Sequence, residues 1–240
     1  MSATKNKTVL LTGATGGIGS AIAKKLTSEG AHVVGTSPSP EEASVLEQEL
    51  RSTDATARVI SVDFLDNNLS NELESSLAPF QEFDWIIHCA GYIDPQESFE
   101  NLTNLKKTFE VNLYPLFALF QIFSDRLTHD GGVISISSTA SLTGNGKLPL
   151  YATSKGALNT LTQSIAHSFR DTNKRAVVLC PGPTNTQMRE ELAHDAAQQQ
   201  SPEVLADAVL RIIQNSDAYQ NGDVWVVRDE NESRFSRFEH

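Results

Sequence analysis

The feature that most constrains the fold is a short apolar run followed at once by a cluster of glycines near the amino terminus. Thr-Val-Leu-Leu at residues 8–11 is typical of a buried strand, and Thr-Gly-Ala-Thr-Gly-Gly-Ile-Gly follows at residues 12–19. Ile22 and Leu26 then predict a helix that Gly30 ends. Glycines let backbone approach a phosphate, and a helix start favours negative charge. This order predicts a site for a dinucleotide pyrophosphate, whereas glycines alone would indicate only a tight turn.

A second group of polar residues follows a β-branched run in the middle of the chain. Residues 131–138 predict a turn and a strand, so Ser138 is expected at the strand's carboxyl end, where open parallel sheets bind ligands. Tyr151 and Lys155 are four residues apart and would share one face of a helix. A nearby cation lowers the pKa of a phenol from about 10, which favours acid–base chemistry on an oxygen that Ser138 also contacts. Taken alone, the Tyr–Lys pair is more typical of an ordinary surface helix.

Taken together, these motifs resemble the short-chain dehydrogenase/reductase family of single-domain enzymes. The family's Thr-Gly-x-x-x-Gly-x-Gly pattern is met within residues 12–19, and its Ser and Tyr correspond to Ser138 and Tyr151, 13 residues apart. The resemblance covers nearly the whole chain. It implies that residues 1–240 form one domain with a doubly wound parallel α/β sheet, the Rossmann fold. The catalytic residues that it implies are Asn112, Ser138, Tyr151 and Lys155.

The resemblance also implies a role for each of these residues. Tyr151 is the acid or base, and Lys155 lowers its pKa and binds the nicotinamide ribose. Ser138 polarises the substrate oxygen. Asn112 helps hold a water that relays protons to the lysine. The cofactor-binding residues that the family pattern implies are Gly13, Thr15, Gly16, Gly17, Ile18, Gly19, Thr36, Ser37, Asp63, Phe64, Ala90, Gly91, Tyr151, Lys155, Pro181, Gly182, Thr184 and Thr186. Among them, Asp63 fits a helix cap nearly as well as an adenine contact.

The end of the second predicted strand bears on the choice of nicotinamide cofactor. An Asp or Glu there would bind the ribose hydroxyls of NAD, and none is present. Thr36, Ser37 and Ser39 instead offer hydroxyls to a 2′-phosphate, although no Arg or Lys follows to neutralise it. We therefore expect NADP, with NAD as the alternative. Ser39 also fits a helix cap before Pro40.

Residues 85–91 hold the main departure from the family pattern. Ala90 and Gly91 match its Asn-Asn-Ala-Gly, whereas His88 and Cys89 replace the two asparagines. No other His, Cys or carboxylate is spaced with His88 as a ligand set, so we expect a packed strand residue and no metal. Cys89 and Cys180 both end apolar runs, which indicates reduced, buried thiols rather than a disulfide.

Three further segments carry expectations about partners and motion. The large apolar residues at 105–123 exceed one helical stripe, and Pro115 should interrupt or begin that helix. The helix is either wholly internal or, as the resemblance implies, packs with the helix of Tyr151 against their copies in a homodimer or homotetramer. Residues 187–200 predict a mobile helix, and the resemblance implies that it covers the substrate as a lid. The polar tail after the strand at 224–227 is expected to be disordered.

Composition excludes several other classes of protein. A net charge of −11 offers no basic surface to nucleic acid or to an anionic membrane. Residues 1–7 are polar, and no apolar run approaches the roughly 18 residues of a membrane span. We therefore expect a soluble, cytoplasmic protein.

The activity that the resemblance implies is hydride transfer between NADP(H) and a carbonyl or secondary alcohol of a small molecule. A sugar-nucleotide epimerase is an alternative, because Gly13, Gly16 and Gly19 also fit that branch, but the 85 residues after Lys155 are too few for its sugar-binding lobe. A nucleotide-sensing protein without turnover is the alternative from another class. The segments expected to line the pocket give no chemical preference for a substrate.

Overall fold

The structure is a computed structural model that describes residues 4–52, 56–190, 192, 199–214, 218–229 and 231–235. Within these residues, the strands are β1 (Thr8–Thr12), β2 (His32–Ser37), β3 (Ala57–Ser61), β4 (Phe83–His88), β5 (Leu127–Ile136), β6 (Arg175–Pro181), β7 (Val224–Arg228) and β8 (Asn231–Arg234). The helices are α1 (Gly17–Ser28), α2 (Pro40–Arg51), α3 (Leu69–Leu77), α4 (Leu105–Asn112), α5 (Tyr114–Phe123), the 3-10 helix η1 (Ser124–Arg126), α6 (Ala140–Thr143), α7 (Pro149–Ser168), α8 (Gln187–Glu190) and α9 (Pro202–Gln214). None of these helices is long and apolar enough to cross a membrane.

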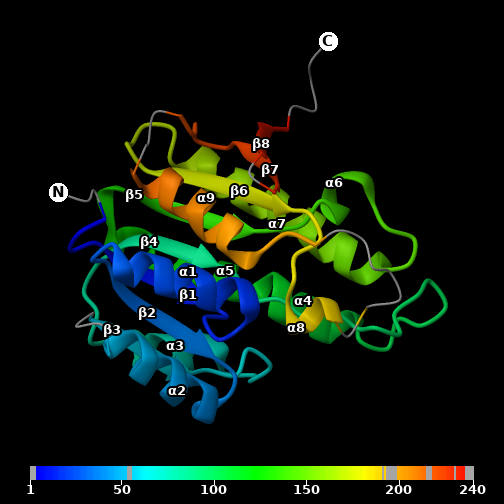
Figure 1. Cartoon of the computed structure of the whole chain (residues 1–240), viewed down its shortest axis with the longest axis horizontal. Helices are drawn as coiled ribbons and strands as arrows, with labels where there is room; N and C mark the ends of the chain where they lie inside the picture. The colour runs from blue at the N-terminus through cyan, green and yellow to red at the C-terminus, as the bar shows by residue number, and fades with distance from the viewer. Residues whose placement is uncertain are drawn as a thin grey trace.

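All the strands of the described residues belong to one sheet, in the order β3-β2-β1-β4-β5-β6-β7-β8 (Figure 1). Each neighbouring pair from β3 to β7 is parallel, which confirms the predicted doubly wound α/β fold. The strand order changes direction between β1 and β4. In open parallel sheets the carboxyl ends of the strands at such a point form the ligand-binding crevice.

The residues of β1 alternate between two apolar cores, one on each face of the sheet. Val9 and Leu11 belong to the core that also contains α1, α2 and α9, whereas Leu10 belongs to the core that contains α3, α5 and α7 (Figure 1). This alternation follows from the period of two along a strand. Because helices cover both faces, Val9 to Thr12 of β1 and Trp85 to His88 of β4 are all buried, which explains the uninterrupted apolar runs in the sequence.

The segment after β7 differs from the expected disordered tail. The strand β8 pairs antiparallel with β7, after a turn in which Asp229 has a positive φ of 51°. An ion pair of 2.7 Å between Arg234 and the buried carboxylate of Asp223 fixes β8 to the sheet. The expectation was wrong for β8, because its polar residues make specific pairs that an apolar pattern does not reveal. Residues 236–240 lie outside the described residues.

The long apolar segment of the sequence forms two helices rather than one. The helix α4 ends at Asn112 and α5 begins at Tyr114, with Pro115 in the first turn of α5, which confirms the predicted interruption. The backbone N–H of Leu116 donates to the carbonyl of Leu113 at 3.2 Å. The carbonyl of Asn112 is therefore released from the helical pattern and is available to other donors.

Candidate active site

The first turn of α7 positions the predicted tyrosine and lysine. Pro149 occupies the start of the helix, but the preceding Leu148 supplies no side-chain cap. Instead, the carboxylate of Glu97 accepts the backbone N–H of Tyr151 at 3.0 Å. The hydroxyl of Ser137 donates to the carbonyl of Lys155 at 3.1 Å, which ties the helix to the end of β5. These contacts place both side chains beside the carboxyl ends of the central strands.

Ser138, Tyr151 and Lys155 come together at this edge of the sheet. Ser138 follows β5 by two residues, and its hydroxyl lies close enough to the phenol of Tyr151 to lower the pKa of that phenol. The ammonium nitrogen of Lys155 lies 5.9 Å from the centroid of the Tyr151 ring. The same nitrogen donates to the carbonyl of Ile136 at 2.9 Å. The three side chains thus surround one small polar region.

Burial dominates the protonation of this group. Burial raises the pKa of Tyr151 to about 12, and the nearby Ser138 hydroxyl opposes that rise. Burial also lowers the pKa of Lys155 to about 8. The effect of Lys155 on the pKa of Tyr151, which the sequence predicted, stays a prediction.

Asn112 meets the same region from the end of α4. Its amide oxygen accepts the N–H of Tyr92 at 2.6 Å, and its amide nitrogen donates to Ser154 at 2.9 Å. Gly91 lies between Asn112 and the lysine. A Cβ atom there would be 3.5 Å from the Lys155 nitrogen and 3.8 Å from the Asn112 amide oxygen. The structure thus brings all four predicted catalytic residues together.

The glycine turn has the form of a cradle for a phosphate group. At Gly13, where φ is 64°, a Cβ atom would approach the backbone of Ala90 to 2.7 Å, and at Gly19 one would meet the carbonyl of Gly13. Gly16 precedes α1 without a side-chain cap, and the first turn contains no acidic residue. Uncapped N–H groups at a helix start bind anions, so the turn fits the dinucleotide that the sequence implies.

The ends of β2 and β3 lie beside this turn. The hydroxyl of Thr15 is 2.8 Å from that of Ser37, and both Thr36 and Ser37 are buried at the end of the strand. Ser39 accepts the N–H of Glu42 at 3.2 Å, which confirms its predicted use as a helix cap. The carboxylate of Asp63 accepts the backbone N–H of Leu65 at 2.9 Å. Asn68 occupies the N-terminal cap position of α3, so Asp63 does not cap that helix. Phe64 packs into the core of α3 and α5, while Ile18 packs into the core of α1 and α9.

The loop after β6 reaches the glycine turn through one threonine. A Cβ atom on Gly17 would lie 2.7 Å from the methyl group of Thr186, so these two residues touch. The hydroxyl of Thr184 is engaged inside the loop, where it donates to Gly182 at 3.0 Å and accepts from Gln200 at 3.2 Å. Pro181, buried at the end of β6, accepts the N–H of Thr139.

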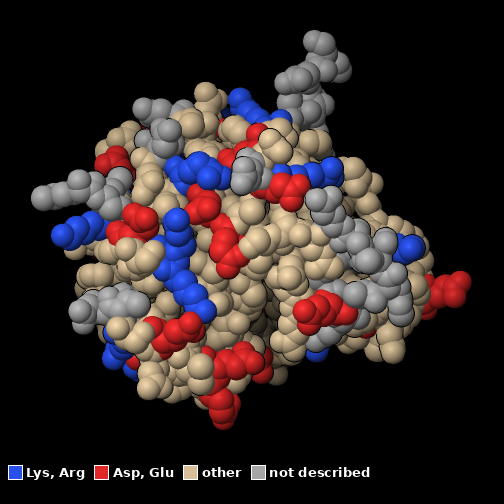
Figure 2. All heavy atoms as spheres, in the orientation of Figure 1, with Lys and Arg blue, Asp and Glu red and all other residues tan. Residues whose placement is uncertain are grey.

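The predicted lid is described in part. The short helix α8 begins it, and the methyl carbon of Met188 lies within 3.8 Å of the Cβ position of Gly91. Gln200 closes the segment by pairing with Thr184. Residues 191 and 193–198 lie outside the described residues. In Figure 2 the surface is hollowed beside α8, next to the carboxyl ends of the central strands seen in Figure 1, and charged side chains of both signs are interspersed around it.

Three residues of the site were not predicted from the sequence. Glu97 caps α7, Ser154 fixes the amide of Asn112, and Met188 approaches Gly91. The signal for Glu97 is the absence of a Ser, Thr, Asp or Asn before Pro149, which requires the cap to come from elsewhere. Ser154 stands one residue before Lys155 and faces α4 by helical geometry. Nothing in the sequence distinguishes Met188.

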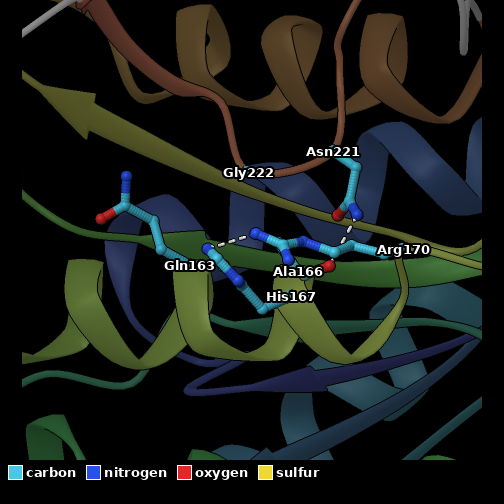
Figure 3. A pocket seen from close by; sticks show the side chains of 6 residues that line it. All are labelled: Gln163, Ala166, His167, Arg170, Asn221 and Gly222. Carbon is cyan, nitrogen blue, oxygen red and sulfur yellow. Dashed lines mark hydrogen bonds between the residues drawn. The ribbon is translucent and has the colours of Figure 1, made fainter. Parts of the chain in front are cut away.

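A second hollow lies on the opposite end of α7, away from this site. It is formed by Gln163, Ala166 and His167 of the helix, by Arg170 just after its end, and by the loop at 221–222 (Figure 3). The amide of Asn221 donates to the carbonyl of Ala166 at 2.7 Å and accepts from the N–H of Ala176, so it joins α7 to β6. Among the described residues, no group of three His, Cys, Asp or Glu side chains could hold a metal ion.

Known proteins match this chain along most of its length. Residues 7–197 match the sequence profile of a family described as short chain dehydrogenase. A human protein described as dehydrogenase/reductase SDR family member 11 is 29% identical over 250 residues, which cover 92% of this chain and 93% of that protein. General stress protein 39 of Bacillus subtilis is 28% identical over 75% of this chain and 64% of its own length, so the chain spans less than two thirds of that relative. A short-chain dehydrogenase of Burkholderia cenocepacia, solved with NADP, has a TM-score of 0.85 and 25% identity over 94% of this chain and 97% of that one.

Proposed function

The chain belongs to the short-chain dehydrogenase family, and from that premise we propose that it transfers a hydride between NADP(H) and the carbonyl or secondary alcohol carbon of a small molecule. The observation that carries this proposal is the group of Ser138, Tyr151 and Lys155 beside the glycine turn. The Ser138 hydroxyl lies close enough to the phenol of Tyr151 to lower its pKa, and the Lys155 nitrogen lies 5.9 Å from the centroid of the tyrosine ring. This is the arrangement of an acid–base site at a ligand-binding crevice.

Each residue has one task in the proposed reaction. A bound nicotinamide would supply or accept the hydride. Tyr151 gives a proton to the carbonyl oxygen during reduction, and it remains protonated across the working range because its pKa is about 12. Ser138 donates a hydrogen bond to the same oxygen. Lys155, whose pKa is about 8, returns a proton to the tyrosine near neutral pH, and Asn112 orders the path to it.

We propose NADP as the cofactor because of the residues at the end of β2. The hydroxyl of Thr15 lies there, bonded to the buried hydroxyl of Ser37, and Ser39 caps α2. No Asp or Glu stands between Thr36 and Pro40 to bind the ribose hydroxyls of NAD. The NADP complex of the Burkholderia relative supports the same choice.

Replacing Tyr151 with phenylalanine tests the proposed role directly. Loss of a general acid typically costs about 100- to 10,000-fold in rate, and we expect a fall in kcat of that order for Tyr151→Phe. The change removes one oxygen, so NADPH affinity should remain within about threefold. The assay follows NADPH absorbance with a panel of ketones, 3-oxoacyl esters and sugars. Tyr219→Phe is the matched control, since its hydroxyl contacts Glu232 away from the site.

The two alternatives predict different results in the same assay. A nucleotide-sensing protein would bind NADPH tightly and turn over no member of the panel, and unchanged turnover by Tyr151→Phe would exclude the assigned role. An epimerase would act on a sugar nucleotide without net consumption of NADPH. The panel is broad because the residues beside the crevice carry no charge pattern that selects one substrate.

Thermal stability measured with each nucleotide tests the cofactor assignment. A ligand that binds the folded state raises the unfolding temperature according to its affinity. We expect NADPH to give the larger increase at equal concentration. A larger increase with NADH would reverse the assignment.

Location and assembly complete the proposal. Two free thiols, Cys89 and Cys180, fit a reducing compartment, and we place the protein in the cytoplasm. We also propose a homodimer or homotetramer formed through α4 and α5, where Tyr114 and Phe117 are exposed. Residues 1–240 then act as one nucleotide-binding unit.

A further inference from the structure

His88, which replaces the usual asparagine of the family, lies at the centre of a hydrogen-bonded unit. Its side chain at the end of β4 is fully buried. The ring nitrogen Nδ1 is 2.9 Å from the hydroxyl of Thr12, and Nε2 is 3.0 Å from the carbonyl of Asn112. The expected packed strand residue therefore has a polar partner at each ring nitrogen.

The direction of every hydrogen bond in this unit is determined. A carbonyl can only accept, so Nε2 carries the proton and donates to Asn112, and Nδ1 accepts from the Thr12 hydroxyl. The Thr12 oxygen in turn accepts the backbone N–H groups of Cys89 and Ala90, each at 3.1 Å. Burial lowers the pKa of His88 to about 3, and the charge of Lys155 acts in the same direction, so the ring stays neutral.

The two ends of the unit belong to the two halves of the candidate active site. Thr12 precedes the first residue of the glycine turn, Gly13. At the other end, the carbonyl of Asn112 is free for His88 because the break between α4 and α5 releases it from the helix. The amide of the same asparagine lies across Gly91 from Lys155. A displacement at either end would thus be transmitted to the other through the imidazole.

We propose that His88 is a positioning residue that links the carbonyl of Asn112 to Thr12. It thereby fixes Asn112, which lies on the proposed proton path, relative to the glycine turn that would bind the cofactor. The proposal rests on the proposed function for the meaning of the proton path. The hydrogen-bonded unit itself can be tested without substrate or cofactor.

Three variants at this position separate the two ends of the unit. His88→Gln keeps an acceptor for Thr12 and a donor long enough for the Asn112 carbonyl. His88→Asn keeps the contact with Thr12 but is one bond too short for the carbonyl, and His88→Leu loses both contacts. Ser135→Ala is the matched control, because Ser135 is the buried neighbour of His88 in the sheet and bonds Thr162 instead of the site.

The expected kinetic result is a split between kcat and cofactor binding. His88→Gln should stay within about threefold of the parent in both. His88→Asn should lose about tenfold or more in kcat with NADPH affinity nearly unchanged, since small displacements of catalytic groups have effects of this size. His88→Leu should lose both, and Ser135→Ala neither. Parent-like kcat in His88→Asn, or no rescue by glutamine, would overturn the positioning role.

Nitrogen NMR of the imidazole provides the measurement that does not depend on activity. With ¹⁵N-labelled histidine, and with His88→Gln to assign the signal, we expect a neutral ring at pH 5 that carries its proton on Nε2. A charged ring, or a proton on Nδ1, would exclude the unit whatever the enzyme does. If instead the NMR result holds and Tyr151→Phe keeps full turnover, the proposed function fails while the unit stands.

Discussion

Lys155 shows at the scale of a single residue how function and stability compete. Its side chain is buried, and its nitrogen has the carbonyl of Ile136 as a hydrogen-bond partner but no carboxylate in an ion pair among the described residues. An unpaired buried ammonium group is costly. Its pKa falls from 10.5 to about 8 on folding, which corresponds to a penalty of about 3 kcal/mol below pH 8. Between pH 8 and 10.5 only the unfolded chain keeps this proton, so this penalty disappears as the pH rises.

We expect Lys155→Met to be more stable than the parent at pH 7 and inactive. The gain should be about 2 kcal/mol, because the lost hydrogen bond to Ile136 offsets about 1 kcal/mol of the relieved penalty. The gain should shrink as the pH approaches 10.5. Urea unfolding at pH 7 and pH 10 measures both values. Lys25→Met is the control, since that lysine is exposed and pairs with Asp207 at 2.9 Å; a pH-independent difference for Lys155→Met would contradict the argument.

At the scale of elements, the contact of Gly17 with Thr186 joins the glycine turn to the loop after β6, and we expect cofactor binding to depend on it. We expect Gly17→Ala to weaken NADPH binding by about tenfold or more, because its new methyl group would lie 2.7 Å from the methyl carbon of Thr186. Thr186→Ser removes that carbon and keeps the hydroxyl. The double variant should therefore recover much of the affinity.

A double-mutant cycle on NADPH dissociation constants measures this coupling. The coupling should be favourable and should equal most of the loss caused by Gly17→Ala. Purely additive effects would mean that the alanine acts on the nucleotide rather than on the loop. Gly146→Ala serves as a control glycine, since nothing lies within 4 Å of its Cβ position.

The elements that could be predicted from the sequence are those with a local signal. The strand and glycine turn near residue 12, the helix with Tyr151 and Lys155, and the break at Pro115 all follow from spacing or from one backbone property. The cap of α7 could not be predicted in this way, because Glu97 lies 54 residues from its partner Tyr151. The same holds for His88, whose two partners are brought together by strand pairing and by the break between helices.

At the scale of the whole molecule, exposed apolar side chains gather around α4 and α5. They comprise Phe99, Leu102, Leu105, Tyr114 and Phe117. The sequence left open whether this segment is internal or faces a partner. Its inner side packs into the core with Leu116 and Leu119, while Phe117 is 54% exposed. The exposed apolar side chains of this segment are not needed for the core. They fit the proposed contact between copies of this chain.

We expect Phe117→Asp to shift the protein to a monomer, because the change would bury a charge at the proposed contact. Light scattering coupled to size-exclusion chromatography measures the mass. Val45→Asp is the matched control, since Val45 is 66% exposed on α2. If the parent is a monomer, or if both variants keep the parent mass, α5 is not the contact.

The antiparallel β8 has a consequence for the protein's behaviour at high concentration. An exposed edge strand has unpaired backbone N–H and C=O groups that can pair with a strand of another protein chain, which is a common start of aggregation. Here β8 pairs with the edge of β7. The new edge strand is only four residues long and carries the charged residues Glu232 and Arg234. The polar segment after β7 therefore protects the sheet from pairing with strands of other chains. Truncation after Arg228 would leave the edge of β7, with Trp225, Val226 and Val227, open to such pairing.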